Sequence, residues 1–262
     1  GRWYEMGGGG TPWDAIVYDT DLDQLYIGTG NGSPWNRQIR SDGKGDNLFL
    51  GSVLALNPDS GEYLWHYQES PGESWDFTST QPMILADLPF GGETRKVILH
   101  APKNGFFYVL DRRTGRVLSA NNFAPTYWAT HVDLATGRPA VVPNAYYDNG
   151  PFLGSPTGLG AHNWSPMSYS PLTGLVYFRA SHASMIYRHD PNFVFREGLN
   201  NVGIYRGPPS AEDRALNAAT PPLAGSSLIA WDPVAGGPRF KIEGLGGGVL
   251  STAANLLFQG RG

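Results

Sequence analysis

The chain of 262 residues is 40% hydrophobic and 16% charged, a balance that indicates a globular protein and excludes a disordered one. Its formal net charge is −4 and no run of Lys or Arg occurs, which excludes an electrostatic footprint for nucleic acid or an anionic membrane surface. The sequence shows no apolar stretch of ~18 residues, no signal-peptide pattern and no Cys. Because it lacks an initial Met and stops just after a strand-like run at NLLFQGRG, we expect both ends to be cut from a longer protein.

Glycine, proline and aromatic residues give the clearest indication of fold class. The chain contains 35 Gly, 21 Pro and 13% aromatic residues, which predicts many short strands joined by tight turns, and therefore an all-β protein. One pattern recurs, in which apolar alternation is followed by an acidic or Pro-containing turn closed by Gly and then by apolar alternation again. It occupies residues 52–68, 105–121, 165–181 and 227–243.

Each repeat is predicted to be an antiparallel hairpin. At Asp59-Ser60-Gly61 we expect the Asp side chain to bond its own backbone and the Gly to take the positive φ. Further strand candidates stand between the hairpins, at residues 15–18, 25–28, 82–88 and 96–100. Together they give four strands per unit.

Repeated four-stranded sheets with an aromatic residue late in the last strand, such as Trp65, predict a partial β-propeller. The expected blades are about 11–68, about 77–121 and about 161–243, with a partial blade at 246–262. The segments 122–160 and 182–226 are expected to be insertions, and loops that long are usually functional or disordered. A β-sandwich would not explain a two-hairpin unit that recurs over such lengths.

The stretch GESWDFTSTQP, residues 72–82, places an acid in unusual surroundings. Asp76 stands between two aromatic residues, and several hydroxyl groups are close in sequence, namely those of Ser74, Thr78, Ser79 and Thr80. Flanking aromatic rings disfavour ionisation, whereas hydroxyls or a metal ion restore it, a combination typical of tuned active-site acids. Two interpretations stay open on these residues alone: Asp76 is a general base, or it caps a turn through its own backbone.

Two glycine-rich stretches precede this acid. In GGGGTPW (7–13) the glycines allow the backbone to approach a flat ligand, and Trp13 supplies a stacking face. YIGTGNGSPWN (26–36) lacks the spaced third Gly of a dinucleotide-binding motif and has Pro34 where a helix would start, so we reject that cofactor. Asn31 offers a neutral oxygen of the kind that calcium accepts beside a carboxylate, or serves only as a turn residue.

Two later stretches add a cation and an amide. Lys103 stands at a tight turn, where its ammonium group either points from the end of a blade or is simply solvated. His162, Asn163 and Trp164 precede a strand, but no His or Cys partner stands at ligand spacing, so a zinc site is not expected. The sequence also has no Gly-x-Ser-x-Gly nucleophile elbow.

Taken together and in this order, these stretches resemble one known family. The segments GGGGTPWDAIVYD, LYIGTGNGSPWN, GESWDFTSTQPMILADL, RKVILHAPKNGFFYVLDRRTG and GAHNWSPMSYSP are similar to those of the pyrroloquinoline quinone (PQQ)-dependent, or quinoprotein, alcohol dehydrogenases. The resemblance covers nearly the whole chain, but only a central part, less than half, of a full catalytic subunit. It implies an eight-bladed propeller that holds PQQ and a metal ion on its axis.

The resemblance also implies a role for each matched residue. Asp76 falls on the catalytic base, and Asn31 together with Asp76 falls on the metal ligands. The implied cofactor-binding residues are Trp13 as the indole that stacks under PQQ, Lys103 at the quinone oxygens, Asn163, and Thr11. In the implied mechanism the cation polarises the quinone carbonyl, Asp76 takes the alcohol proton, and hydride passes to the quinone carbon.

Departures from the family pattern set limits on this assignment. The family's vicinal Cys pair, metal-binding Glu and cofactor-contacting Arg would stand upstream of Gly1, so we expect the isolated chain to be inactive. Leu245-Gly246 replaces an aromatic-Asn pair, and Ser165 stands where the family often has His. Thr78 occupies the position, two residues after the base, where the lanthanide-dependent branch has an extra Asp. A trivalent ion benefits from that added negative ligand, so calcium is expected here.

Two other functions stay open. A non-catalytic propeller scaffold or binding protein, like the outer-membrane assembly propellers, needs only the hairpin repeats. A related quinoprotein sugar dehydrogenase would differ in the loops that select the substrate. For the alcohol dehydrogenase, the resemblance implies a small alcohol substrate, a cytochrome c-type acceptor or a fused haem domain outside this chain, and a periplasmic location.

Overall fold

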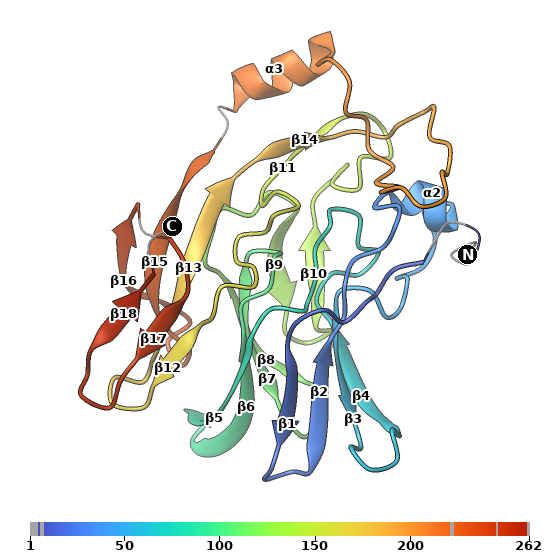
Figure 1. Cartoon of the computed structure of the whole chain (residues 1–262). Helices are drawn as coiled ribbons and strands as arrows, with labels where there is room; N and C mark the ends of the chain where they lie inside the picture. The colour runs from blue at the N-terminus through green and yellow to red at the C-terminus, as the bar shows by residue number, and fades with distance from the viewer. Residues whose placement is uncertain (1–4, 6–7, 221–222, 245, 261–262) are drawn as a thin grey trace.

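Three four-stranded antiparallel sheets follow one another along the chain in the computed structural model, which describes residues 5, 8–220, 223–244 and 246–260 (Figure 1). The first sheet consists of β1 (Ile16–Asp19), β2 (Gln24–Gly28), β3 (Ser52–Leu56) and β4 (Tyr63–Gln68). The second consists of β5 (Met83–Phe90), β6 (Glu93–His100), β7 (Phe106–Asp111) and β8 (Val117–Asn122). The third consists of β12 (Ser168–Ser170), β13 (Leu175–Ala183), β15 (Ala224–Asp232) and β16 (Gly237–Glu243). The all-β prediction is confirmed.

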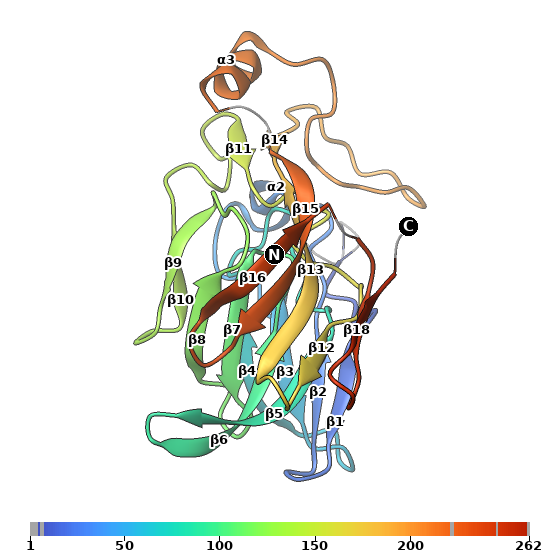
Figure 2. The ribbon, with the colours of Figure 1, turned by 90° about the vertical axis from the view of Figure 1, so that its left-hand side faces the viewer.

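The remaining elements are short and lie in the connections between strands or after the third sheet. β9 (Ala129–Asp133) pairs with β10 (Arg138–Val141), and β11 (Phe152–Gly154) pairs with β14 (Met185–Tyr187). β17 (Val249–Ser251) and β18 (Leu257–Gln259) form a hairpin after the third sheet. Helix α2 (Arg37–Ser41) follows the first sheet's second strand, and α3 (Ala211–Ala219) projects above β14 (Figure 2). No helix in the described ranges is long and apolar enough to span a bilayer.

The four hairpins predicted from the repeat are present as β3–β4, β7–β8, β12–β13 and β15–β16. Their turn chemistry differs from the expectation in one respect. The side chain that accepts the backbone N–H groups of Asp59 and Ser60 belongs to Asn57, at 3.0 and 2.9 Å, and not to Asp59. The same geometry recurs at Asp111 and Asp232. These three turns are therefore organised by an Asp or Asn at or just after the end of the first strand, because its carboxyl or amide oxygen reaches the N–H groups two and three residues later.

The first and second sheets are joined by an aromatic ring packed onto a glycine. Gly115 has a φ of +71°, and a Cβ atom there would lie 2.4 Å from Cε3 of Trp65. The Trp65 indole N–H also donates to the carbonyl of Arg112 at 3.2 Å. Since Trp65 lies on β4 and Gly115 on the β7–β8 turn, this contact fixes the first sheet against the second. Only a residue without a side chain allows so close an approach.

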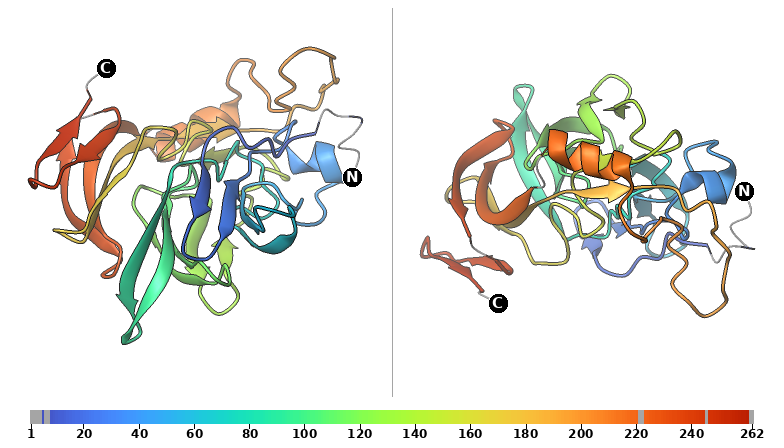
Figure 3. Two further views of the ribbon diagram at one scale, coloured as in Figure 1. Left: turned by 60° about the horizontal axis from the view of Figure 1, so that its bottom comes forward. Right: turned by 90° about the horizontal axis from the view of Figure 1, so that it is seen from above.

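The connections between strands separate into two ends of the molecule. Because antiparallel strands alternate in direction, the tight turns β1–β2, β3–β4, β5–β6 and β7–β8 gather at one end (Figures 1 and 3). The longer segments, which join β2 to β3, β4 to β5, β6 to β7 and β8 to β12, gather at the opposite end. Because binding and catalytic residues often lie on loops that a rigid scaffold positions, we expect a functional site at the end with the long connections.

Candidate functional site

Every site residue predicted from the sequence lies on the end that carries the long connections. Trp13 precedes β1, Asn31 follows β2, Asp76 lies between β4 and β5, Lys103 follows β6, and Asn163 precedes β12. These positions come from all three sheets. The fold therefore brings segments that are distant in sequence to one end of the molecule.

Asp76 is the one residue between Tyr67 and Gln81 that is not buried. Its neighbours Trp75 and Phe77 are 0% and 1% exposed, and the Trp75 indole donates to the carbonyl of Ala145 at 2.7 Å. These two aromatic rings anchor the segment in the core. The Asp76 side chain between them is 21% exposed, so it is the group of this segment that solvent or a ligand can reach.

The Asp76 backbone adopts a φ of +68°, in the left-handed region that a non-glycine residue rarely occupies. Strain of this kind costs about 1–3 kcal/mol and persists where the surroundings over-determine it, often at active sites. Burial raises the pKa of the Asp76 carboxyl to about 6, while the ammonium of Lys103 lowers it and the carboxyl of Glu73 raises it further. A carboxyl with such a pKa is suited to accept a proton near neutral pH.

Lys103 is the partner that partly stabilises the charged form of Asp76. Its Nζ atom donates to Oδ2 of Asp76 at 3.1 Å, to the carbonyl oxygen of Asp76 at 2.9 Å and to the carbonyl oxygen of Gly158 at 2.7 Å. The Lys103 side chain is only 7% exposed, so it is not the solvated turn lysine of the alternative interpretation.

The hydroxyl groups expected around Asp76 do not bind its carboxylate in the described part of the chain. Ser74 donates to the carbonyl of Gly72 at 2.9 Å, and the hydroxyl groups of Thr78 and Thr80 bond each other at 3.1 Å. Of the two groups expected to favour the ionised form of Asp76, hydroxyls or a metal ion, the hydroxyls do not contact it, and the ammonium of Lys103 lowers its pKa. The turn-capping interpretation also fails, because the Glu73 side chain accepts the local N–H groups.

Glu73 was not singled out from the sequence. It is 0% exposed, and its Oε1 atom accepts the N–H groups of Trp75 at 2.6 Å and Phe77 at 2.9 Å. Its Oε2 atom accepts the N–H group of Gly32 at 3.0 Å. The available signal was an acid three residues before Asp76 in a stretch otherwise free of charge.

Asn31 stands in a loop packed against the glycine run. Its carbonyl accepts the N–H of Gly10 at 2.9 Å, and a Cβ atom on Gly9 would lie 2.6 Å from that same oxygen. The close backbone approach that these glycines permit is therefore to the Asn31 loop. The Asn31 amide nitrogen donates to the carbonyl of Gly32 at 2.9 Å, while the described residues give its side-chain oxygen no hydrogen-bond donor.

Trp13, Thr11 and Asn163 lie at the margins of the site. Trp13 is 44% exposed and Thr11 is exposed, with the carbonyl of Thr11 packed against Gly30. Asn163 donates to the carbonyl of Leu159 at 2.8 Å, next to the Gly158 that Lys103 binds. The structure thus joins Asp76 directly to Lys103. Convergence of Trp13, Asn31 and Asn163 with this pair on one central cavity stays a prediction.

Backbone carbonyl groups occupy both ring nitrogens of His162. Its Nδ1 and Nε2 atoms lie 2.7 Å from the carbonyl of Ala101 and 2.9 Å from that of Ser165, and burial lowers its pKa to about 4. Within the described ranges, no group of three or more His, Cys, Asp or Glu side chains could hold a metal ion. Leu245, part of the Leu245-Gly246 departure, lies outside the described residues, as do Gly7, Arg261 and Gly262.

The side-chain oxygens still fit part of a calcium site. Asp76 offers Oδ1, since Lys103 takes Oδ2, and Asn31 offers its amide oxygen. One carboxylate and one neutral oxygen are the hard donors that calcium prefers, although calcium takes six to eight oxygens in total. The oxygens of Glu73 are taken up by backbone N–H groups, so Glu73 is not a further ligand.

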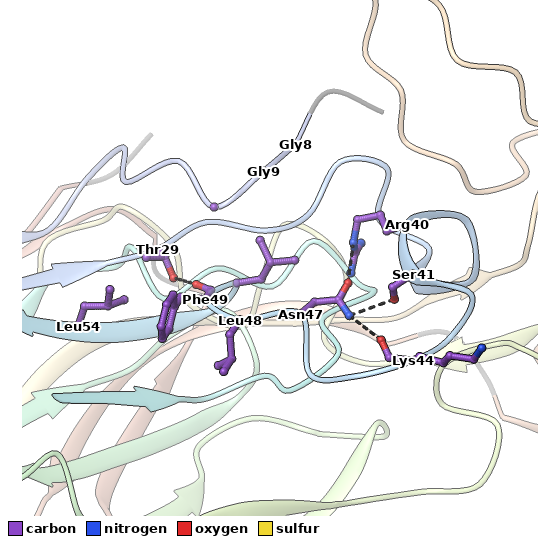
Figure 4. A pocket seen from close by; sticks show the side chains of 12 residues that line it. Gly8, Gly9, Thr29, Arg40, Ser41, Lys44, Asn47, Leu48, Phe49 and Leu54 are labelled. Carbon is purple, nitrogen blue, oxygen red and sulfur yellow. Dashed lines mark hydrogen bonds between the residues drawn. The ribbon is translucent and has the colours of Figure 1, made fainter. Parts of the chain in front are cut away.

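A cavity of about 590 Å³ lies beside the glycine run, and none of the predicted site residues lines it (Figure 4). Its walls include Gly8, Gly9, Thr29, Arg40 and Phe49. Figure 4 shows Asn47 in contact with Arg40, Ser41 and Lys44, so the polar groups of this cavity bond to one another.

Comparisons with known proteins identify the family of this chain. A family model for the β-propeller domain of PQQ-containing glucose, ethanol and alcohol dehydrogenases matches residues 1–124. The quinohemoprotein alcohol dehydrogenase ADH IIB of Pseudomonas putida is 48% identical over 263 residues, which cover 99% of this chain and 37% of that protein. The chain belongs to the PQQ-dependent alcohol dehydrogenase family.

Solved structures of the family share the fold of this chain. The quinohemoprotein alcohol dehydrogenase ADHIIG of Pseudomonas putida HK5 superimposes with a TM-score of 0.90 at 48% identity, covering 99% of this chain and 39% of that one. A europium-containing methanol dehydrogenase superimposes with a TM-score of 0.82 at 31% identity, covering 96% and 43%. The predicted partial propeller is confirmed, and the chain spans 37% of the length of ADH IIB.

Proposed function

We propose that the longer protein containing this chain oxidises alcohols to aldehydes with PQQ and calcium, using Asp76 as the general base. The observation that carries the proposal is the half-buried, positive-φ Asp76, whose pKa is raised by partial burial to about 6 and whose Oδ2 atom lies 3.1 Å from Nζ of Lys103. Aspartate with this pKa is mostly ionised at neutral pH and still basic enough to accept a hydroxyl proton in the transition state.

The other residues bind and orient the reactants. Asn31 and Asp76 would hold a calcium ion through one amide and one carboxylate oxygen, with the remaining ligands supplied from outside this chain. Trp13 would stack against the flat cofactor, and Lys103, Asn163 and Thr11 would contact its polar edge. When bound, PQQ accepts the hydride and calcium acts as a Lewis acid.

The choice of calcium rests on Thr78. Thr78 is buried, and its hydroxyl oxygen accepts hydrogen bonds from Thr80 at 3.1 Å and Gln81 at 2.8 Å. The lanthanide-dependent branch, which this sequence resembles, has an Asp at the position of Thr78. Thr78 is neutral, and its hydroxyl group is already hydrogen-bonded. Since ligand charge raises affinity for hard cations, the lower charge of this site favours the divalent ion.

Electrons would leave through a haem group that this chain does not contain. The relative ADH IIB is named a quinohemoprotein, and we infer a cytochrome c-type acceptor or fused haem domain for the present protein too. A periplasmic location is part of the same proposal. Because the chain spans 37% of that relative and carries two of the calcium ligands, we expect it to be inactive in isolation.

The test is reconstitution of the complete gene product with PQQ and calcium, followed by assays with alcohols and aldoses and an artificial dye. Reduction of the dye by alcohols supports the proposal. Reduction by aldoses alone would assign a sugar dehydrogenase. Binding of PQQ without any dye reduction would favour a scaffold.

A further inference from the structure

One buried carboxylate connects the two segments that would hold the cation. The Oε2 atom of Glu73 accepts the N–H of Gly32, the residue that follows Asn31, at 3.0 Å. Its Oε1 atom accepts the N–H groups of Trp75 and Phe77, the two residues that flank Asp76, at 2.6 and 2.9 Å. Gly32 and Glu73 are 41 residues apart and lie on different connections, β2 to β3 and β4 to β5.

Removing a carboxylate from water is costly, so a fully buried one needs compensation. Burial raises the pKa of Glu73, whereas Arg40 and the three backbone N–H groups lower it. Arg40 is itself buried; it donates to the carbonyl of Glu73 and also to that of Pro34 at 2.6 Å. The arrangement therefore ties the Asn31 loop to the Asp76 segment at several points.

The positive φ of Asp76 depends on the same hydrogen bonds. A residue in this conformation is strained, and its direction is set by the peptide groups on either side. Through a single oxygen Glu73 accepts the N–H of Phe77, which belongs to the peptide group after Asp76, and the N–H of Trp75, the residue before Asp76. Loss of that oxygen would release the segment from the conformation in which it presents Asp76.

We propose that Glu73 is a positioning residue that sets the separation of Asn31 and Asp76, and through it the cation affinity of the site and the direction of the base. This inference rests on the proposed function. Glu73 does not bind the cation or the substrate, since its oxygens are occupied by backbone N–H groups. Residues that orient metal ligands in this way typically change affinity or activity ~10–100-fold when they are replaced.

The experiment uses the full-length enzyme with Glu73→Gln, Glu73→Asp and Glu69→Gln. Gln keeps the size of Glu73 but turns one acceptor oxygen into a donor, which cannot face a backbone N–H. Glu69 is the matched control, because it is also 0% exposed, bonds His100 at 2.8 Å and, among the described residues, has no side-chain hydrogen bond to the Asn31 or Asp76 segments. Calcium affinity is measured by titration calorimetry on metal-free protein with PQQ, alongside kcat and thermal stability.

We expect Glu73→Gln to weaken calcium binding ~10–100-fold, with Glu69→Gln unchanged in affinity even where its stability falls. Glu73→Asp keeps both acceptors on a shorter stem, so it should retain the bonds within its own loop and lose the one to Gly32. At saturating calcium, the kcat of Glu73→Asp should therefore be close to that of the wild type, whereas its calcium affinity should stay lower.

Equal calcium affinity and kcat in Glu73→Gln and Glu69→Gln would overturn the inference. If Glu73→Gln does not fold, a calcium affinity in Glu73→Asp equal to that of the wild type would also overturn the inference. Failure of the unmodified enzyme to bind calcium or to oxidise alcohols would instead contradict the proposed function, and the variants distinguish the two cases.

Discussion

Lys103 and Asp76 form the most direct contact of the candidate site, because Nζ of Lys103 lies 3.1 Å from Oδ2 of Asp76 and 2.9 Å from its carbonyl oxygen. One ammonium group therefore holds both the backbone and the carboxylate of the proposed base. A further bond of 2.7 Å to the carbonyl of Gly158 orients that ammonium group. The contact links the β4–β5 connection to the β6–β7 connection and to the segment before β12.

Replacement of Lys103 by Met should shift the pH dependence of turnover. The ammonium of Lys103 lowers the pKa of Asp76 against the larger effect of burial, so its removal raises that pKa. Asp76 must be deprotonated to act as a base, and the acidic limb of the kcat/KM profile of the full-length enzyme should therefore move to higher pH. Turnover near neutral pH should fall ~10–100-fold.

Lys96→Met is the control for that measurement. Lys96 bonds Asp21 at 2.5 Å and Asp87 at 3.3 Å, far from the long connections, and its loss should leave the profile in place. An acidic limb that stays fixed in Lys103→Met would show that Asp76 is not the titrating base.

Calcium binding should weaken at acidic pH. In the metal-free protein burial raises the pKa of Asp76 to about 6, and protonated Asp76 must release its proton before it binds a cation. Apparent calcium affinity should be nearly constant above pH ~7 and fall about tenfold for each pH unit below about 6. Calorimetric titration from pH 5 to 8 measures this, and Asp76→Asn should bind calcium weakly without that dependence.

Gly115→Ala should destabilise the protein more than Gly174→Ala does. Both glycines have nearly the same positive φ, +71° and +70°, so both substitutions introduce the same backbone strain. A Cβ atom at Gly115 would lie 2.4 Å from Trp65, whereas one at Gly174 would meet nothing within 4 Å. The difference in free energy of unfolding, measured with denaturant, should be about 1–3 kcal/mol. Equal values would mean that the Trp65 contact does not hold the two sheets together.

Thr78→Asp should shift metal preference toward lanthanides. The substitution adds a negative group two residues after Asp76, and added ligand charge favours a trivalent ion. The unmodified enzyme should turn over with calcium and the variant should gain activity with lanthanum. Burial of Thr78 makes some loss of stability expected as well, so thermal unfolding should be measured in parallel. An unmodified enzyme that works only with lanthanum would contradict the interpretation of Thr78.

Sequence patterns predicted the features that repeat along the chain. The hairpins follow from period-two alternation and from turns closed by glycine, both of which are local. Even there, the turn-forming side chain was misplaced by two residues, because Asn57, just after β3, accepts the N–H groups of Asp59 and Ser60 in place of the expected Asp59 side chain. The local sequence therefore predicts where a turn forms, but it does not predict which side-chain oxygen accepts the hydrogen bonds of the turn.

Contacts between distant segments could not be derived from the residues alone. Asp76 and Lys103 are 27 residues apart, and nothing in either stretch indicates that one ammonium group binds both the carbonyl and the carboxylate of the other residue. Glu73 was missed for a related reason, since its function depends on Gly32 from another connection. Family resemblance named Asp76 and Lys103, but only three-dimensional packing shows how they are held.

The assignment of Asn31 and Asp76 as calcium ligands is tested most directly by a crystal structure of the full-length enzyme with PQQ and calcium bound. We expect the Asn31 amide oxygen and an Asp76 carboxylate oxygen to lie about 2.3–2.6 Å from the calcium ion, with Trp13, Lys103 and Asn163 around the cofactor. A calcium ion bound elsewhere, or bound without Asn31 and Asp76 among its ligands, would contradict this assignment.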